Sequence, residues 1–186
     1  MGFVSPNRNK YQTGGLRHLQ AHHILAEAGE EVFRGYFKFA IVRNPWDKVI
    51  SQWRYLSQRP GLRDYLGVPP DATLAQYLDS IATSDHVQVM PQADFVCDGD
   101  GQLMVDRLGR FETLETDARA IFTRIGLSEA RLPHVTRSER AADCRTYYDA
   151  GTRGRVAELY ARDIALFGYN FRNTQQEIPW RSPIAK

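Results

Sequence analysis

The clearest change of hydrophobic pattern along the chain lies between residues 37 and 53. Residues 37–42 (FKFAIV) form a short run rich in aromatic and β-branched side chains, which is too short for a buried helix and predicts a core strand. The apolar positions that follow recur at steps of three and four residues, as on one helix face that packs on a sheet: Trp46, Val49, Ile50 and Trp53. The pattern therefore predicts a strand, a tight turn and a helix.

Similar patterns predict the other elements. One helix is expected to begin near Leu16, and three others are expected at residues 74–81, 114–125 and 156–167. A second strand is expected at residues 103–111. Thr113 and Thr152 suit N-cap positions, Gly126 and Gly168 suit helix ends, and the prolines and glycines of residues 57–70 predict a loop. The order strand, helix, helix, strand, helix, helix indicates a layered α/β domain.

Polar residues gather where the first strand meets its helix. Asn44 suits the N-cap, Pro45 the first helical position, and Asp47 the first turn, where the helix dipole favours an acid. Arg43 stands at the carboxyl end of the strand, and Ser51 falls on the helix face above Asn44 and Asp47. A guanidinium fork with a hydroxyl suits a phosphate monoester. A solvated arginine and a surface serine would give the same spacing, and on spacing alone this second interpretation is the stronger.

Residues 39–47 (FAIVRNPWD), followed by Val49-Ile50-Ser51, resemble the 3′-phosphate-binding motif of sulfotransferases that use 3′-phosphoadenosine 5′-phosphosulfate (PAPS), of the carbohydrate type. The resemblance implies that Arg43 and Ser51 bind the 3′-phosphate of this cofactor. It also implies a P-loop-NTPase-like parallel sheet flanked by helices, and sulfuryl transfer from PAPS to a hydroxyl acceptor, a carbohydrate. Further matches run to Phe171. The expected organisation is a loop at residues 1–15, one sulfotransferase-like domain at 16–171 and a loose tail at 172–186.

The family pattern also contains a part that we do not find in the sequence. Such sulfotransferases open with a strand, a loop that holds Lys with Gly, Ser or Thr, and a helix, which together bind the 5′-phosphosulfate. Thr13-Gly14-Gly15 has suitable glycines, but no apolar strand precedes it. We therefore expect the first βα unit to be missing. The alternative is a truncated or degenerate member that acts as a noncatalytic nucleotide-binding module, and a third hypothesis, a nucleotide kinase, lacks its G-x-x-x-x-G-K-[ST] motif.

His18 is the candidate catalytic base. In the family, a histidine in an H-L-x-A-like context upstream of the 3′-phosphate motif can deprotonate the acceptor hydroxyl, and the resemblance gives this role to His18. An imidazole suits the role because its pKa lies near working pH, although a solvated or capping histidine is the alternative. His18 and His22 would share a helix face, but no third ligand follows at useful spacing, so we expect no metal.

Two later segments extend the resemblance. His86 and Gln92 can hydrogen-bond a sugar or the phosphosulfate, but capping a loop is the stronger interpretation for both. Residues 110–114 (RFETL) match the strand-to-helix junction of the family, where Arg110 and Glu112 are expected to form a structural pair. Residues 163–171 resemble its C-terminal signature, to which we assign core packing.

Composition excludes several other classes. A chain of 186 residues with 42% hydrophobic content fits one globular domain. Its 24 basic and 22 acidic residues give a net charge of +2, which is no basic field for nucleic acid, so we expect anions to be bound locally. Cys97 and Cys144 form neither a disulfide framework nor a metal-ligand pattern. Without a signal peptide or a transmembrane run, the sequence indicates a cytoplasmic protein.

Overall fold

The computed structural model describes residues 18–132 and 143–172, so the loop expected at residues 1–15 and the tail beyond residue 172 lie outside it. The described elements are α1 (Ala21–Ala28), α2 (Glu30–Gly35), β1 (Phe39–Val42), α3 (Pro45–Ser57), α4 (Pro60–Tyr65), α5 (Leu74–Ile81), α6 (Ala93–Val96), β2 (Arg107–Arg110), the 3-10 turn η2 (Phe111–Thr113), α7 (Leu114–Arg124), the 3-10 turn η3 (Cys144–Tyr147), α8 (Ala150–Leu159) and α9 (Ala161–Phe167). Within these ranges, every helix is too short or too polar to cross a membrane.

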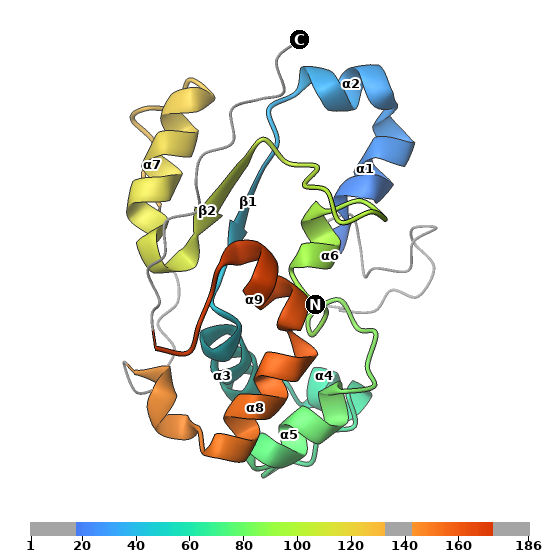
Figure 1. The fold of residues 1–186 in the computed structure, drawn as a ribbon, viewed down its shortest axis with the longest axis vertical. Coiled ribbons are helices and arrows are strands. Elements are labelled where there is room, and N and C mark those ends of the chain that lie inside the picture. The colour runs from blue at the N-terminus through green and yellow to red at the C-terminus, as the bar shows by residue number, and fades with distance from the viewer. Residues whose placement is uncertain (1–17, 133–142, 173–186) are drawn as a thin grey trace.

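The sheet of the described region consists of β1 and β2, which run parallel. Phe39 pairs with Arg107, and Val42 pairs with Arg110, so both strands end at the same edge of the sheet. Helices α7 and α9 flank the strands, while α3, α4, α5 and α8 form a helical half below them (Figure 1). The α/β class is thus confirmed as a small parallel two-stranded sheet flanked by helices, and its P-loop-like character stays a prediction.

Each half of the molecule has its own apolar core. Below the sheet, α3, α5 and α8 pack against one another through fully buried side chains that include Val49, Ile50, Tyr77, Leu78 and Val156. Beside the sheet, Val42 of β1 packs with residues of α6 and of the C-terminal segment: Ala93, Val96, Phe167 and Tyr169. The end of β1 and the start of α3 therefore lie between the two cores.

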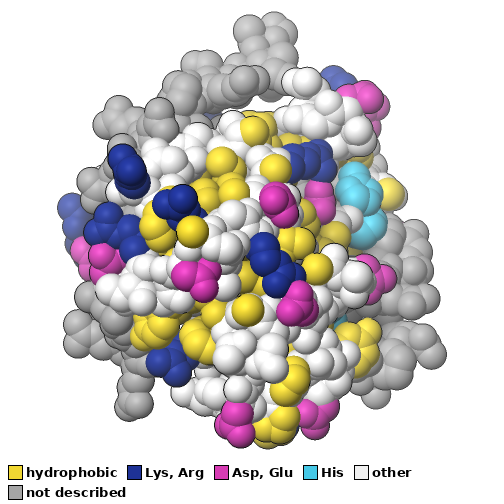
Figure 2. Space-filling model, turned by 60° about the horizontal axis from the view of Figure 1, so that its bottom comes forward, with side chains coloured by type: hydrophobic (Ala, Val, Ile, Leu, Met, Phe, Trp, Pro, Cys, Tyr) yellow, Lys and Arg dark blue, Asp and Glu magenta, His cyan; other side chains and the backbone are white. Residues whose placement is uncertain are grey.

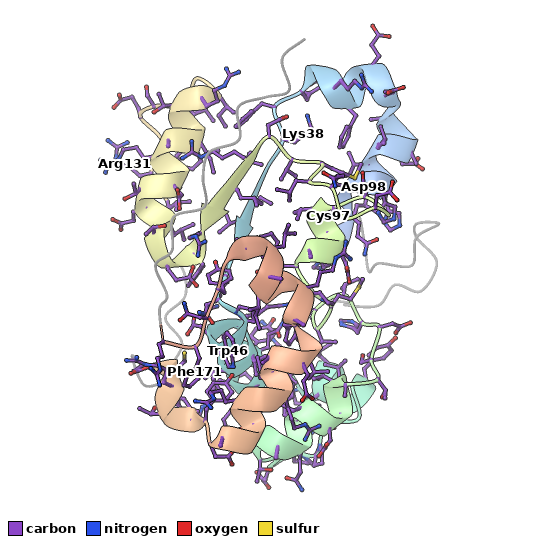
Figure 3. All side chains as sticks on the ribbon, viewed as in Figure 1. Lys38, Trp46, Cys97, Asp98, Arg131 and Phe171 are labelled. Atoms are coloured by element: carbon purple, nitrogen blue, oxygen red, sulfur yellow. The ribbon has the colours of Figure 1, made fainter. Side chains whose placement is uncertain are left out.

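The strand and helix predicted at residues 37–53 are confirmed. The strand covers Phe39–Val42 and the helix covers Pro45–Ser57. Asn44 caps the helix as expected, because its side-chain oxygen accepts a hydrogen bond from the Trp46 N–H at 3.0 Å. Phe171, at the end of the described chain, returns to this helix and lies edge-on to Trp46 with 5.7 Å between ring centroids (Figure 3).

Four other predictions about helices are wrong. The first predicted helix is divided at Gly29, whose φ of 82° ends α1 before α2 begins. The loop predicted at residues 57–70 contains α4, which Pro60 starts at a position where its missing N–H costs nothing. Asp149, rather than Thr152, caps α8, and the last helix is divided at Tyr160 into α8 and α9.

The second strand is shorter than predicted. Only Arg107–Arg110 pairs with β1, whereas Leu103 forms an isolated antiparallel bridge with Cys97. Within β2, Gly109 lets α7 approach closely, because a Cβ atom there would lie 2.6 Å from the Ile41 side chain and 3.0 Å from the Asp117 Cβ. Glycine at this position therefore fixes the distance between α7 and the sheet.

Candidate active site

Arg43 follows β1 at the carboxyl edge of the sheet, as predicted. Its guanidinium is largely buried, with 17% of the side chain exposed. The Nε–H donates to Asp47 Oδ2 at 2.5 Å, and Nη2 lies 2.5 Å from the same oxygen. The Phe111 ring covers one face of the guanidinium, with 4.2 Å between the guanidinium carbon and the ring centroid. The side chain is thus held in one orientation by an ion pair and an aromatic ring.

This arrangement leaves part of the guanidinium available. Arginine has five N–H groups, and Asp47 occupies the edge formed by Nε and Nη2. The end formed by Nη1 and the second Nη2 hydrogen has no hydrogen-bond partner among residues 18–132 and 143–172. That end presents two N–H groups side by side, which is the geometry that binds two oxygens of a phosphate.

Ser51 lies on α3 one helical turn beyond Asp47. The two residues occupy the same face of the helix, because residues four apart are neighbours on a helix surface. The Ser51 side chain is partly exposed and has no hydrogen-bond partner in the described part of the chain. Asp47 and Ser51 thus lie on one face of α3, and the phosphate-binding role of Arg43 and Ser51 stays a prediction.

Gln92 holds the backbone of Arg43. Its Oε1 accepts a hydrogen bond from the Arg43 N–H at 2.8 Å, and its Nε2 donates to the Arg43 carbonyl at 2.8 Å. Asp163 of α9, which is 0% exposed, accepts from the backbone N–H of Gln92 and of Ala93, each at 2.8 Å. Of the two interpretations of Gln92, the structure shows a structural contact with the backbone. Asp163 was not identified from the sequence as part of this arrangement. An acidic residue within the mostly apolar segment 163–171 is the signal that could have pointed to it.

Glu112 holds the backbone of Asn44, the residue that follows Arg43. Its Oε1 accepts from the Asn44 N–H at 2.6 Å, and its Oε2 accepts from the Tyr169 hydroxyl at 3.0 Å. The predicted pair of Arg110 and Glu112 is wrong, because Arg110 instead donates to the Phe167 carbonyl at 2.7 Å and stacks on the Tyr169 ring. Burial, followed by the charge of Glu112, raises the pKa of Tyr169, so its hydroxyl stays a donor.

Residues 88–92 run alongside α3 and are fastened to it by side chains. Gln52 donates to the Gln88 carbonyl, and the Lys48 ammonium donates to the Met90 carbonyl at 2.6 Å. Burial lowers the pKa of Lys48 to about 8, although the charges of Asp163 and Asp94 oppose the shift. Together with Gln92 on Arg43, these contacts attach the segment at three successive points.

His18 lies just before α1 rather than on it, so the predicted helix face shared with His22 is wrong. The structure instead relates His18 to His86, whose pKa is lowered first by burial and then by the charge of His18. His86 Nδ1 accepts from the Gln88 N–H at 3.3 Å, and its ring meets Tyr65 edge-on. No interaction joins His18 directly to Arg43 or Ser51 within the described ranges, so its role as a base stays a prediction.

The other charged side chains of the described residues are scattered. Over residues 18–132 and 143–172, no cluster of three or more histidine, cysteine or acidic side chains could hold a metal ion. On the face shown in Figure 2, basic and acidic side chains are interspersed with apolar ones, and neither sign of charge dominates. On this face, an anion is therefore attracted by local groups and not by a broad field.

Two parallel strands and an arginine-bearing strand-to-helix junction at their carboxyl edge define an α/β protein with a candidate phosphate site. The chain belongs to the sulfotransferase family, whose family model matches residues 6–170. An uncharacterized protein of Archaeoglobus fulgidus is 28% identical over 106 residues, which cover 57% of this chain and 81% of that protein. No solved structure matches the chain significantly. The resemblance seen in the sequence is thereby confirmed at the level of the family, which indicates a sulfuryl transferase.

Proposed function

We propose that this protein transfers a sulfuryl group from PAPS to a hydroxyl group of a carbohydrate. The observation that carries the proposal is the geometry of Arg43 at the carboxyl end of β1. Its guanidinium is fixed by Asp47 and Phe111, while the end of its fork remains available to an anion. Membership in the sulfotransferase family supports the reaction class. The donor and the carbohydrate acceptor come from the sequence motif and are proposals.

The residues at the junction fit the 3′-phosphate of this donor. The free end of Arg43 would give two charge-assisted hydrogen bonds, and the Ser51 hydroxyl would give a third donor on the same face of α3. Asp47 cancels part of the arginine charge, so binding depends on the direction of the N–H groups as well as on charge. A dianionic phosphate uses both contributions, whereas a weakly basic anion gains less from them.

PAPS, when bound, supplies the sulfuryl group that is transferred. The residues of this chain would hold the nucleotide through Arg43 and Ser51 and remove the acceptor proton through His18. Fixing both reactants in one geometry accounts for a large part of the rate of such displacements. A neutral imidazole at His18 would accept the hydroxyl proton, and His86 lies close enough for its pKa to respond to the charge of His18.

Two measurements test the proposal. Calorimetry should show that the protein binds 3′-phosphoadenosine 5′-phosphate more tightly than adenosine 5′-monophosphate, and that Arg43→Ala abolishes this preference. Equal affinity for both nucleotides would refute the phosphate site. Transfer of radiolabelled sulfate from PAPS to a panel of oligosaccharides should then be detected. Binding of the bisphosphate with no transfer to any acceptor would instead identify a noncatalytic nucleotide-binding module.

A further inference from the structure

The backbone of Arg43 lies just beyond the last residue of β1 that pairs with β2. The pairing of β1 with β2 ends at Val42 and Arg110, and α3 begins at Pro45. The N–H and the carbonyl of Arg43 therefore belong neither to the strand ladder nor to the helix. Partly buried backbone groups of this kind gain from partners, because an unpaired group costs free energy and leaves the peptide free to rotate.

One side chain supplies both partners. The Gln92 amide accepts from the Arg43 N–H and donates to the Arg43 carbonyl, each at 2.8 Å. A primary amide carries a donor and an acceptor on one planar group, so it can bond both backbone groups of one residue, as a neighbouring strand would. Neither a carboxylate nor an apolar side chain of the same length can make both bonds.

Gln92 is itself fixed by a buried acid. Asp163 Oδ2 accepts from the Gln92 backbone N–H at 2.8 Å and from its Nε2 at 3.2 Å, and Oδ1 accepts from the Ala93 N–H at 2.8 Å. These contacts orient the Gln92 amide, because the carboxylate can only accept and so selects the nitrogen end. The peptide of Arg43 is thereby tied to α9 through two residues.

We infer that Gln92 is a positioning residue for the phosphate site, which it serves by holding the Arg43 backbone while Asp47 and Phe111 hold the guanidinium. The inference rests on the proposed role of Arg43. Rotation of the Arg43 peptide would swing the whole side chain, and a misplacement of about 1 Å at a site of this kind can reduce its effect by about a hundredfold. Gln92 thus acts on the nucleotide through Arg43 and without touching it.

The test compares Gln92→Met with Gln52→Met. Gln52 is the matched control, since it also fastens the 88–92 segment by a hydrogen bond to backbone but does not contact Arg43. Calorimetry would measure affinity for 3′-phosphoadenosine 5′-phosphate and for adenosine 5′-monophosphate. Gln92→Met should weaken binding of the bisphosphate by about tenfold or more and leave the monophosphate within about twofold, while Gln52→Met should change neither selectively.

A double-mutant cycle separates positioning from general damage. In the Arg43→Ala background, Gln92→Met should have no further effect on bisphosphate affinity, because the residue it positions is gone. An equal loss in both backgrounds, or an equal loss for both nucleotides, overturns the inference while the proposed function stands. If the unaltered protein shows no preference for the bisphosphate, both fail. Should Gln92→Met not fold, Gln92→Asn keeps the amide but cannot reach both groups, and it should give the same selective pattern.

Discussion

Replacing Arg43 by lysine should damage nucleotide binding although the charge is kept. The Arg43 guanidinium meets three demands at once: it pairs with Asp47, lies over the Phe111 ring, and presents two N–H groups at its free end. An ammonium is a compact point charge that cannot stack in the same way or grip a phosphate at two points while it holds an acid. The substitution therefore removes directed hydrogen bonds and retains the positive charge.

The size of the effect follows from the bonds that are lost. A hydrogen bond to a charged group contributes about 1.5–3 kcal/mol, and lysine would lose at least one of the two offered to the phosphate. The corresponding loss of affinity for 3′-phosphoadenosine 5′-phosphate is about 10-fold to 150-fold. Adenosine 5′-monophosphate, which lacks the 3′-phosphate, should bind the variant and the unaltered protein alike.

Calorimetry with both nucleotides, on protein whose thermal unfolding has been recorded, checks this expectation. A change confined to the bisphosphate places the lost contacts at the 3′-phosphate. If Arg43→Lys weakens both nucleotides equally, or lowers only the unfolding temperature, then Arg43 supports the fold and the phosphate assignment is refuted.

Three further perturbations have expected outcomes. His18→Ala should lower turnover by about 100-fold with nucleotide affinity unchanged, and normal turnover would exclude His18 as the base. The same variant should raise the pKa of His86 in an NMR titration, because the charge of His18 lowers that pKa. Burial lowers the pKa of Lys48 from 10.5 to about 8, so between these values the unfolded chain holds more protons than the folded one and Lys48 makes stability rise with pH. Urea unfolding of Lys48→Met should lack this rise, which is about 3 kcal/mol in full, and identical pH profiles would contradict the buried position of the ammonium. Gly109→Ala should destabilise the protein by about 1–3 kcal/mol, because its Cβ would lie 2.6 Å from the Ile41 side chain of β1 and 3.0 Å from the Asp117 Cβ of α7. Gly61→Ala, with open space around it, should not, and equal stability of the two variants would refute the close packing around Gly109.

Local patterns were sufficient to predict the strand, the cap and the helix around Arg43. Asn44, Pro45 and Asp47 each act within one turn of the helix they start, so their effect is visible in neighbouring residues. The same local rules failed at residue types that occur in more than one kind of local structure. Pro60 was interpreted as part of a loop but begins α4, and Gly29 interrupts a stripe whose apolar spacing continues past it.

The side chains that hold the backbone of Arg43 and Asn44 could not be predicted from local patterns. Gln92 lies 49 positions from Arg43, and Glu112 lies 68 positions from Asn44. No periodicity links residues so far apart, and hydrogen bonds between a side chain and the backbone leave little trace in composition. Arg110 and Glu112 were paired because opposite charges stand close in sequence, yet each found a better partner in the C-terminal segment.

The buried carboxylate of Asp163 would link the proposed nucleotide binding to the docking of α9. It lies in α9, the last helix that the structure describes, whereas Arg43 directly follows β1, so the proposed phosphate site would be complete only when α9 has docked. A nucleotide that binds only the complete site would stabilise the folded protein by about 2.7 kcal/mol at a free concentration one hundred times its Kd. Transient opening of α9 would lower the apparent affinity by the fraction of molecules in which it is open. Amide exchange in α9 should therefore slow as nucleotide is added, so this helix would report occupancy of a site more than 100 positions away in the sequence.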